Sequence, residues 1–174
     1  GRKYLDFPHE MQAGILLHRF IDTYTDAHPI FRQSTKRLHK PYGHYSGVII
    51  DIFYDHFLAK NWNSYCPIAL STFVEDFYSS LQTNWNLLPA KFKHLVPYMI
   101  EGNWLVNYAS MEGIQSVLNG MNRRTKYKSN MNRATNELKT YYVEFENEFL
   151  SFFEELQKAT LQKRETLIKE FQIE

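Results

Sequence analysis

The sequence predicts an all-α protein, folded as a single-domain helical bundle. Along most of the chain, apolar residues recur at the three- and four-residue intervals of a helix with one buried face. Hydrophobic residues make up 44% of the 174 residues and aromatic residues 16%, which favours a packed core over disorder. Only 7 Gly and 6 Pro occur, and they fall where helices are expected to start or stop.

Four helices are expected in the first half of the chain. The first runs from about Pro8 to about Tyr24, with Asp6 as its N-cap and Pro8 in its first turn. The next three each follow a break, at Pro29, at Lys40-Pro41-Tyr42-Gly43 and at Pro67. Their expected ranges are 30–39, 44–61 and 68–82.

The second half continues the helical pattern. A short helix is framed by Pro89 and Pro97, and another covers about 111–123, with Asn119-Gly120 as a weak point inside it. The strongly charged tail, about 130–171, predicts one long helix or two. The sequence shows no linker or internal repeat, so we expect one domain over 1–174.

Charge and cysteine content limit the function classes. The net charge is +1, from 20 basic and 19 acidic residues, which gives no general case for nucleic acid or membrane binding. No apolar run approaches the roughly 18 residues of a membrane span. Cys66 is the only cysteine, so an internal disulfide is impossible, as is typical of a reducing compartment. We expect a cytoplasmic protein that binds neither nucleic acid nor membranes.

His18 and Asp22 form the first candidate site. Their spacing of four residues places both side chains on one helix face. They can ligate one metal ion together, or Asp22 can orient the imidazole. Alone, the pair is more typical of a structural contact.

The second candidate site consists of His44, Asp51 and Asp55. They follow one another at spacings of seven and four residues along one helical stripe, which also includes Gly47. Two carboxylates one turn apart repel each other, and a cation or a shared proton offsets this on a central, mostly apolar helix. The alternative is that these residues simply face water, but the apolar flanks favour a functional site. His56 points about 100° away from Asp55, so it either supports the site or packs in the core.

Other charged residues are weaker candidates. Arg19 and Arg32 can grip a phosphate or form ordinary salt bridges. Asp26 lies in a segment, 25–29, that we expect to cap the following helix. Two runs of basic residues either form ordinary solvated surface or bind an acidic protein or phosphates. The runs are Arg123, Arg124, Lys126 and Lys128, and Lys36, Arg37 and Lys40.

Short motifs along the chain, in matching order, resemble those of the acyl carrier protein phosphodiesterase family. The motifs are Ala13-Gly14-Ile15-Leu16-Leu17-His18-Arg19-Phe20-Ile21-Asp22, Thr25-Asp26, Asp51, Asp55-His56-Phe57-Leu58-Ala59, Trp104-Leu105-Val106-Asn107-Tyr108 and Gly113-Ile114-Gln115-Ser116-Val117-Leu118-Asn119-Gly120-Met121. Their order and spacing match from about residue 9 to about residue 153.

The resemblance implies a helical fold related to the HD-domain phosphohydrolases. It implies hydrolysis of the phosphodiester that joins 4′-phosphopantetheine to a Ser of holo acyl carrier protein, with Mn²⁺, or Mg²⁺, as cofactor. The acidic carrier protein is then the expected partner of Arg123, Arg124, Lys126 and Lys128. Family members usually carry an N-terminal His and a Gly-Asn-x-x-x-Asp-Phe segment, so we expect the chain to lack a natural N-terminal segment that completes the site.

With this resemblance, the expected metal ligands are His18, Asp22, Asp51 and Asp55. A bound metal would lower the pKa of a water and polarise the phosphoryl oxygen. Of the remaining expected catalytic residues, Arg19 or Arg32 would stabilise the developing charge and His44 would shuttle a proton. Two alternatives are a non-catalytic helical module that binds an acidic carrier protein, and a metal-dependent phosphodiesterase with another substrate.

Overall fold

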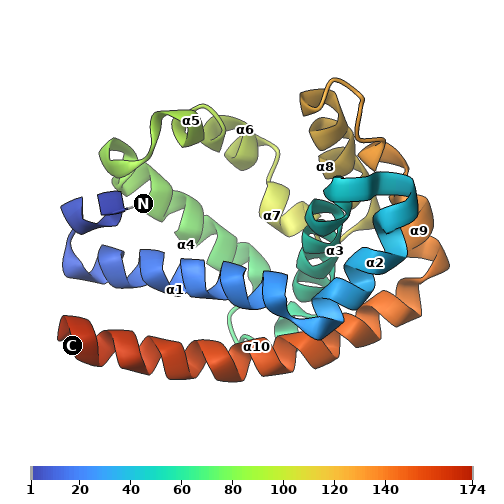
Figure 1. Ribbon diagram of the computed structural model, residues 1–174. Helices are drawn as coiled ribbons and strands as arrows, with labels where there is room; N and C mark the ends of the chain where they lie inside the picture. Colours follow the sequence, from blue (N-terminus) through green and yellow to red (C-terminus); the bar gives the residue numbers. More distant parts are fainter. Residues whose placement is uncertain (1, 174) are drawn as a thin grey trace. The chain divides into compact units, whose positions relative to one another are not determined.

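The structure is a computed structural model that describes residues 2–173, apart from the side chain of Lys3. Every regular element among these residues is a helix, which confirms the predicted all-α class (Figure 1). The chain divides into two compact units. One, the terminal unit, consists of Gly1–Lys40 and Val143–Glu174, and the other, the central unit, of Pro41–Tyr142. The prediction of one domain over 1–174 stays a prediction.

Two long helices run antiparallel in the terminal unit, α1 (His9–Ala27) and α10 (Tyr142–Phe171) (Figure 1). The ring of His9 at the start of α1 meets that of Phe171 at the end of α10, with centroids 5.7 Å apart. Apolar side chains recur at helical spacing and are buried on α10. They are Phe145, Phe149, Phe152 and Leu167. The third long helix of this unit is α2 (Pro29–Tyr42), and η1 (Arg2–Asp6) precedes α1.

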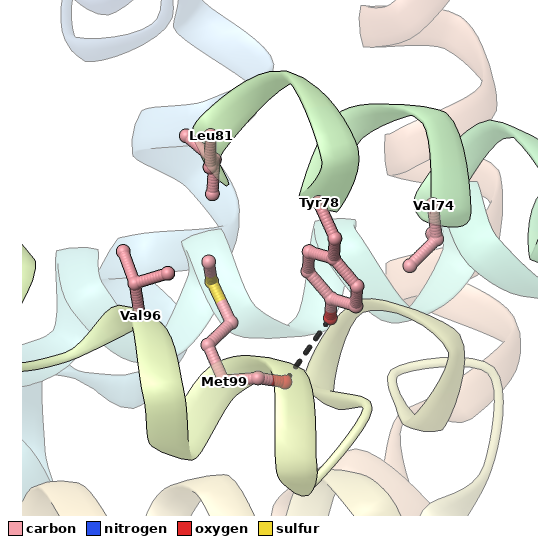
Figure 2. Packing of buried hydrophobic residues seen from close by; sticks show 5 residues of the cluster. All are labelled: Val74, Tyr78, Leu81, Val96 and Met99. Carbon is pink, nitrogen blue, oxygen red and sulfur yellow. Dashed lines mark hydrogen bonds between the residues drawn. The ribbon is translucent and has the colours of Figure 1, made fainter. Parts of the chain in front are cut away.

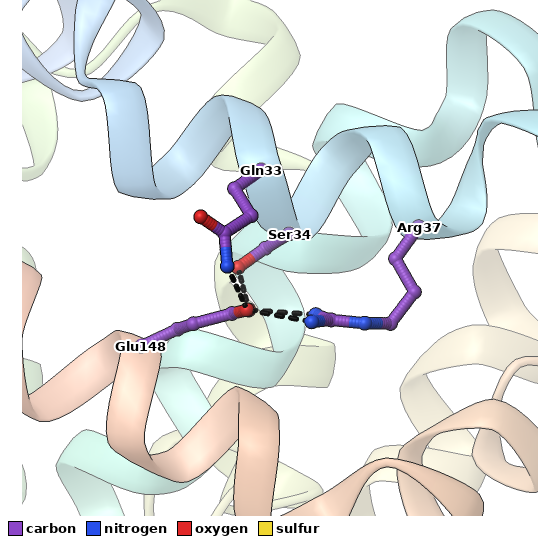
Figure 3. A network of polar contacts seen from close by, with 4 residues as sticks. All are labelled: Gln33, Ser34, Arg37 and Glu148. Carbon is purple, nitrogen blue, oxygen red and sulfur yellow. Dashed lines mark hydrogen bonds and ion pairs between the residues drawn. The ribbon is translucent and has the colours of Figure 1, made fainter.

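A half-buried ion-pair network connects α2 to α10 (Figure 3). Arg37 donates two hydrogen bonds to the Glu148 carboxylate, each of 2.7 Å, and its guanidinium lies 4.9 Å from the Phe145 ring centroid. Ser34 and Gln33 also donate to the same carboxylate. Burial alone would raise the pKa of Glu148, but these bonds outweigh it and lower the pKa. The network therefore holds α2 against α10.

The central unit is built around α3 (Ser46–Lys60), which contacts α8 (Met111–Arg124). Four of the apolar side chains of α3 are fully buried, as its sequence predicted: Ile49, Ile50, Phe53 and Phe57. The remaining helices are η2 (Gly43–Tyr45), η3 (Trp62–Ser64), α4 (Leu70–Thr83), η4 (Trp85–Leu87), α5 (Ala90–Lys93), α6 (Val96–Glu101), α7 (Trp104–Asn107), η5 (Met131–Arg133) and α9 (Thr135–Thr140).

A second apolar cluster joins α4 to α6 in the central unit (Figure 2). It consists of Val74, Tyr78, Leu81, Val96 and Met99. The hydroxyl of Tyr78 donates to the Met99 carbonyl at 3.2 Å, so its one polar atom is satisfied inside the cluster. This contact fixes α6 on α4 and positions the chain that leads into α7.

Several predicted boundaries were wrong. The residue before α1 is Pro8, and Asp6 ends η1 without capping α1. Helix α2 continues through Pro41, because a Pro in the last turn removes only one backbone hydrogen bond, and the chain turns at Gly43, whose φ is +53°. Pro97 lies in the first turn of α6, where its missing N–H is not needed.

The charged tail forms two helices, α9 and α10, with Tyr141 between them. The short helix α7 has no strong signal in the sequence and was not predicted. None of the helices among residues 2–173 combines the length and the apolar character that a bilayer span requires.

Candidate functional site

His18 and Asp22 form a solvent-exposed pair on α1. The Nδ1 atom of His18 lies 3.0 Å from Oδ2 of Asp22, and the two side chains are 77% and 60% exposed. The carboxylate is thus placed to orient the ring, one of the two functional alternatives that the spacing indicates. Nearby on the same helix, the guanidinium of Arg19 lies 4.9 Å from the Tyr4 ring centroid. Metal binding by the pair stays a prediction.

The segment between α1 and α2 caps the second helix, as predicted, but the capping group is His28. Its Nδ1 accepts from the backbone N–H of Ile30 at 3.3 Å, so the proton of the neutral ring is on Nε2, which lies 3.2 Å from Glu155. Arg32 donates from Nε to the Asp26 carbonyl at 3.0 Å. This local bond resembles the structural role that we considered for Arg32, and phosphate binding by this residue stays a prediction.

Asp51 and Asp55 are exposed on α3, one helical turn apart. Gly47 lies one turn earlier, and a Cβ atom placed on it would meet no other atom within 4 Å, so the space beside it is open. His44 is not on α3 itself, because it lies in η2, before the first residue of that helix. Its ring packs on that of Tyr45, with centroids 4.0 Å apart. The stripe therefore consists of Gly47, Asp51 and Asp55.

The Asp55 carboxyl group has an unusual acidity. Its side chain keeps access to solvent, but the protein around the carboxyl group removes enough water to raise its pKa, and the charge of Asp51 raises it further, to about 7. Such a carboxyl group changes its protonation state near neutral pH, which suits acid–base chemistry or cation binding.

Asp55 and Arg124 each lie close enough to Tyr108 for their charges to act on its phenol group. Burial raises the pKa of the Tyr108 phenol, Asp55 raises it further, and Arg124 opposes the rise, which brings the pKa to about 12. The Tyr108 hydroxyl therefore keeps its proton at neutral pH and can donate a hydrogen bond. Tyr108 ends one of the motifs in the sequence, but its proximity to Asp55 depends on tertiary packing that the sequence does not show.

A cavity of about 440 Å³ lies beside Tyr108 in the central unit. Its lining side chains come from α6, α7 and α8 and the adjoining residues. The apolar ones are Leu95, Met99, Trp104, Leu105, Val117 and Met121, and the polar ones are Asn107, Tyr108, Ser116, Arg123 and Arg124. Gly113 makes the approach of α8 to α7 possible, because a Cβ atom there would lie 1.8 Å from the Asn107 carbonyl oxygen.

The predicted partner-binding run begins at the end of α8 and continues into the following turn. Arg123, Arg124, Lys126 and Lys128 are all exposed. Lys126 and Tyr127 adopt left-handed backbone conformations, with φ of 54° and 63°. Asn122 stabilises the turn. Its carbonyl accepts a hydrogen bond from the Tyr127 N–H at 2.9 Å, and its buried side chain accepts one from the Ser129 hydroxyl and donates one to the Asn132 side chain. The turn thus presents its cations on a fixed backbone.

His56 belongs to the core of the central unit. It is 2% exposed, and its Nδ1 lies 2.8 Å from the Tyr108 carbonyl and its Nε2 lies 2.9 Å from the Tyr142 hydroxyl. Since a carbonyl can only accept, Nδ1 carries the proton and Nε2 accepts from Tyr142. Of the two alternatives for His56, the satisfied core histidine fits this geometry.

Asp51 and Asp55 place two carboxylates one turn apart on α3. Among residues 2–173, no three side chains of His, Cys, Asp or Glu gather into a group that could hold a metal ion. Asp51 and Asp55 nevertheless offer oxygen ligands of the kind that Mg²⁺ and Mn²⁺ prefer, and Mg²⁺ commonly takes only one or two carboxylates from a protein, with water and phosphate as further ligands.

Comparison with known proteins gives a consistent result. A family model described as "Acyl carrier protein phosphodiesterase" matches residues 1–156. A curated protein of that name from Photorhabdus laumondii is 31% identical over 145 residues, which cover 83% of this chain and 73% of the relative. One from Yersinia pestis is 30% identical over 166 residues, with 94% and 86% covered. One from Escherichia coli O157:H7 is 30% identical over 154 residues, with 88% and 80% covered. No solved structure matches the chain.

Proposed function

The chain belongs to the acyl carrier protein phosphodiesterase family, and we propose that it hydrolyses the phosphodiester between 4′-phosphopantetheine and the carrier serine of holo acyl carrier protein. The products are apo acyl carrier protein and free 4′-phosphopantetheine. The acidic pair on α3 is the structural observation that supports this proposal best. The raised pKa of Asp55 beside Asp51 marks a group whose charge is strongly influenced by its surroundings, as is common at functional sites.

We propose Mn²⁺ or Mg²⁺ as the cofactor, with Asp51 and Asp55 among the ligands. A cation offsets the repulsion between two neighbouring carboxylates. When bound, such an ion lowers the pKa of a water and polarises a phosphoryl oxygen. His18 and Asp22 stay predicted ligands, and their exposed pair on α1 leaves both side chains open to solvent.

The remaining groups act on the phosphodiester through charge and hydrogen bonding. The protonated Tyr108 hydroxyl can donate to a phosphoryl oxygen, and the nearby guanidinium of Arg124 favours negative charge at the same place. Arg19 or Arg32 stays a predicted second source of positive charge, and His44 stays the predicted proton shuttle, a role that histidine commonly has in enzymes.

The acidic substrate has a matching surface on the protein. Lys126 and Lys128 project from the turn after α8, next to the two arginines that end the helix. A fixed basic turn is suited to an acidic partner, because complementary charge steers the encounter and fixes its orientation. The same turn also supports the second candidate function, a non-catalytic module that binds a carrier protein.

Incubation of holo acyl carrier protein with the protein and Mn²⁺, followed by intact-mass measurement of the carrier, tests the proposal. We expect the loss of one phosphopantetheine group. An unchanged carrier mass would contradict the proposed activity. If the carrier binds without losing mass, the non-catalytic module is favoured, whereas cleavage of a nucleotide phosphodiester alone would favour the third candidate, a phosphodiesterase with another substrate.

A further inference from the structure

We infer that the cavity of the central unit binds the phosphopantetheine arm of the substrate, with the arm along its apolar wall and its phosphate at Arg123 and Arg124. This inference rests on the proposed function and names the part of the protein that holds the leaving group. The volume of about 440 Å³ lies in the range of small-molecule sites, which runs from about 300 to about 1,000 Å³.

The lining of the cavity suits a long ligand that is mainly apolar and carries a few amides. Trp104, Leu105 and Met99 provide apolar surface, while Asn107 and Ser116 offer amide and hydroxyl groups at intervals. A pantetheine arm has this mixed character, because it alternates short carbon chains with two amides and ends in a thiol. A ligand made only of charged groups would leave the apolar part of the wall exposed to water.

The charge of the lining defines which end of the ligand lies where. Arg123 and Arg124 both line the cavity, and its described lining residues include no Asp or Glu. Among residues 2–173, neither guanidinium forms an ion pair, and the contact of Arg124 is with the Met121 sulfur at 3.9 Å. Two guanidinium groups without a carboxylate partner are a suitable site for phosphate, which they bind through paired N–H donors.

The cavity also connects to the acidic pair. Tyr108 lines the cavity, and the charges of both Asp55 and Arg124 act on its hydroxyl. The Tyr108 carbonyl also lies 2.8 Å from Nδ1 of His56, which follows Asp55 on α3. A phosphate held at the Tyr108 side of the cavity therefore lies in the neighbourhood of the segment that carries Asp55, with the arm extending away from it along α7 and α8. This arrangement places the bond to be cleaved at the edge of the cavity, where a carrier protein can reach it.

Gly120 provides a way to fill the cavity without disturbing the fold. It lines the cavity on α8, and a Cβ atom placed on it would meet only Nη2 of Arg123, at 3.8 Å. A Gly120→Leu variant should therefore occupy the ligand space, while the loss of a helical Gly raises helix propensity. Gly120→Ala is a milder second variant. Ser79→Leu on the exposed side of α4 is the matched control, because it adds the same side chain outside the cavity.

Direct binding is measured by titrating the protein with free 4′-phosphopantetheine and following tryptophan fluorescence, with Trp104→Phe to identify the Trp104 signal. We expect saturable binding that is at least about tenfold weaker in Gly120→Leu, less affected in Gly120→Ala and unchanged in Ser79→Leu. Pantetheine without its phosphate should bind about tenfold more weakly than the phosphorylated form, and Arg123→Gln with Arg124→Gln should abolish that difference. Equal affinity of wild type and a folded Gly120→Leu would overturn the inference, as would inorganic phosphate binding as tightly as 4′-phosphopantetheine.

A measurement of turnover distinguishes a failure of this inference from a failure of the proposed function. In a protein that cleaves holo carrier protein, 4′-phosphopantetheine should inhibit competitively, and Gly120→Leu should lower kcat/KM at least about tenfold while Ser79→Leu does not. Wild-type cleavage with an unaffected Gly120→Leu would reject the cavity and leave the proposed function intact. Cavity-dependent binding of 4′-phosphopantetheine without any cleavage by the wild type would reject the proposed function and leave the binding site supported.

Discussion

Asp55 lies one turn after Asp51 on α3, where the loss of water around its carboxyl group and then the charge of Asp51 raise the pKa of Asp55 to about 7. The two carboxylates are therefore a coupled pair and not two independent surface charges. Both side chains are exposed on a helix whose apolar side chains are buried, so neither belongs to the apolar core. Their close placement is thus a feature that function explains better than stability does.

Asp51→Ala is expected to abolish Mn²⁺-dependent release of phosphopantetheine while leaving the helical content intact. The variant removes one proposed metal ligand and a like charge, but no buried side chain. Intact-mass analysis of holo carrier protein measures the activity, and circular dichroism measures the helical content. Asp76→Ala, which removes an exposed carboxylate from α4, is the matched control. Retained turnover in a folded Asp51→Ala protein would rule out the role of Asp51.

Mn²⁺ is expected to raise the melting temperature of the wild-type protein in a saturable manner. A ligand that binds only the folded state at 100 times its Kd stabilises that state by about 2.7 kcal/mol. The shift should be lost in Asp51→Ala and retained in Asp76→Ala. Thermal unfolding followed by circular dichroism is sufficient, since no substrate is needed. A wild-type protein whose melting temperature is insensitive to Mn²⁺ would instead favour the binding module.

The acidic pair also shows how far the sequence could predict the site. The spacing of Asp51 and Asp55 was enough to place them together on one stripe of α3, but the apolar residues beside them gave no sign that both side chains would be exposed. The same reasoning placed His44 on the same α-helix, which was wrong, because the chain forms a 3₁₀ turn there and the α-helix starts at Ser46. A change of helix type over three residues leaves no clear signal in the spacing of apolar residues.

The sequence could not predict the cavity, for a different reason. Its walls come from separate short helices, and the approach of α7 to α8 depends on the absence of a side chain at Gly113. A lone Gly in a helical pattern predicts only a small loss of helix propensity, and the contact that requires it lies on another element. The sequence could therefore identify the motif around Trp104 but not the space that its side chains enclose.

Glu148→Gln is expected to destabilise the protein by about 3 kcal/mol at pH 7, because it leaves the half-buried Arg37 guanidinium without its carboxylate. The pKa of Glu148 is lowered in the folded state from its ordinary value of 4.5. Its contribution is therefore fully present above pH 4.5 and is lost as the pH falls through the folded-state pKa. Urea unfolding from pH 7 down to pH 3 should show the difference between wild type and variant shrinking in that range.

The control for this prediction lies on the same helix. Glu154 pairs with Lys158 at 2.7 Å, but both side chains are exposed, so Glu154→Gln should leave the unfolding free energy almost unchanged. An equal loss of stability in both variants would show that the Glu148 network contributes no more than an exposed helix pair.

His56→Leu is expected to lower the free energy of unfolding by about 2–4 kcal/mol, because it leaves the partly buried Tyr108 carbonyl and Tyr142 hydroxyl without their imidazole partner. The exposed His39→Leu on α2 should have little effect. Urea unfolding at pH 7 measures both. A His56→Leu protein as stable as the wild type would contradict the structural role that we assign to this ring.

Charge reversal at Lys126 and Lys128 should weaken the productive encounter with the acidic carrier protein and leave the chemical step unchanged. Both lysines are exposed on a turn whose backbone Asn122 stabilises, so Lys126→Glu with Lys128→Glu changes the surface charge and not the fold. We expect KM for holo carrier protein to rise about tenfold or more at low salt, with kcat within about twofold of wild type. The effect should shrink as ionic strength increases, because the screening length falls from about 10 Å at 0.1 M salt to about 3 Å at 1 M.

Lys36→Glu with Lys40→Glu, in the other basic run, makes the same change in net charge on α2 and should leave KM nearly unchanged. If instead that control raises KM and the turn variant does not, the carrier protein docks elsewhere, and the turn after α8 is ordinary solvated surface.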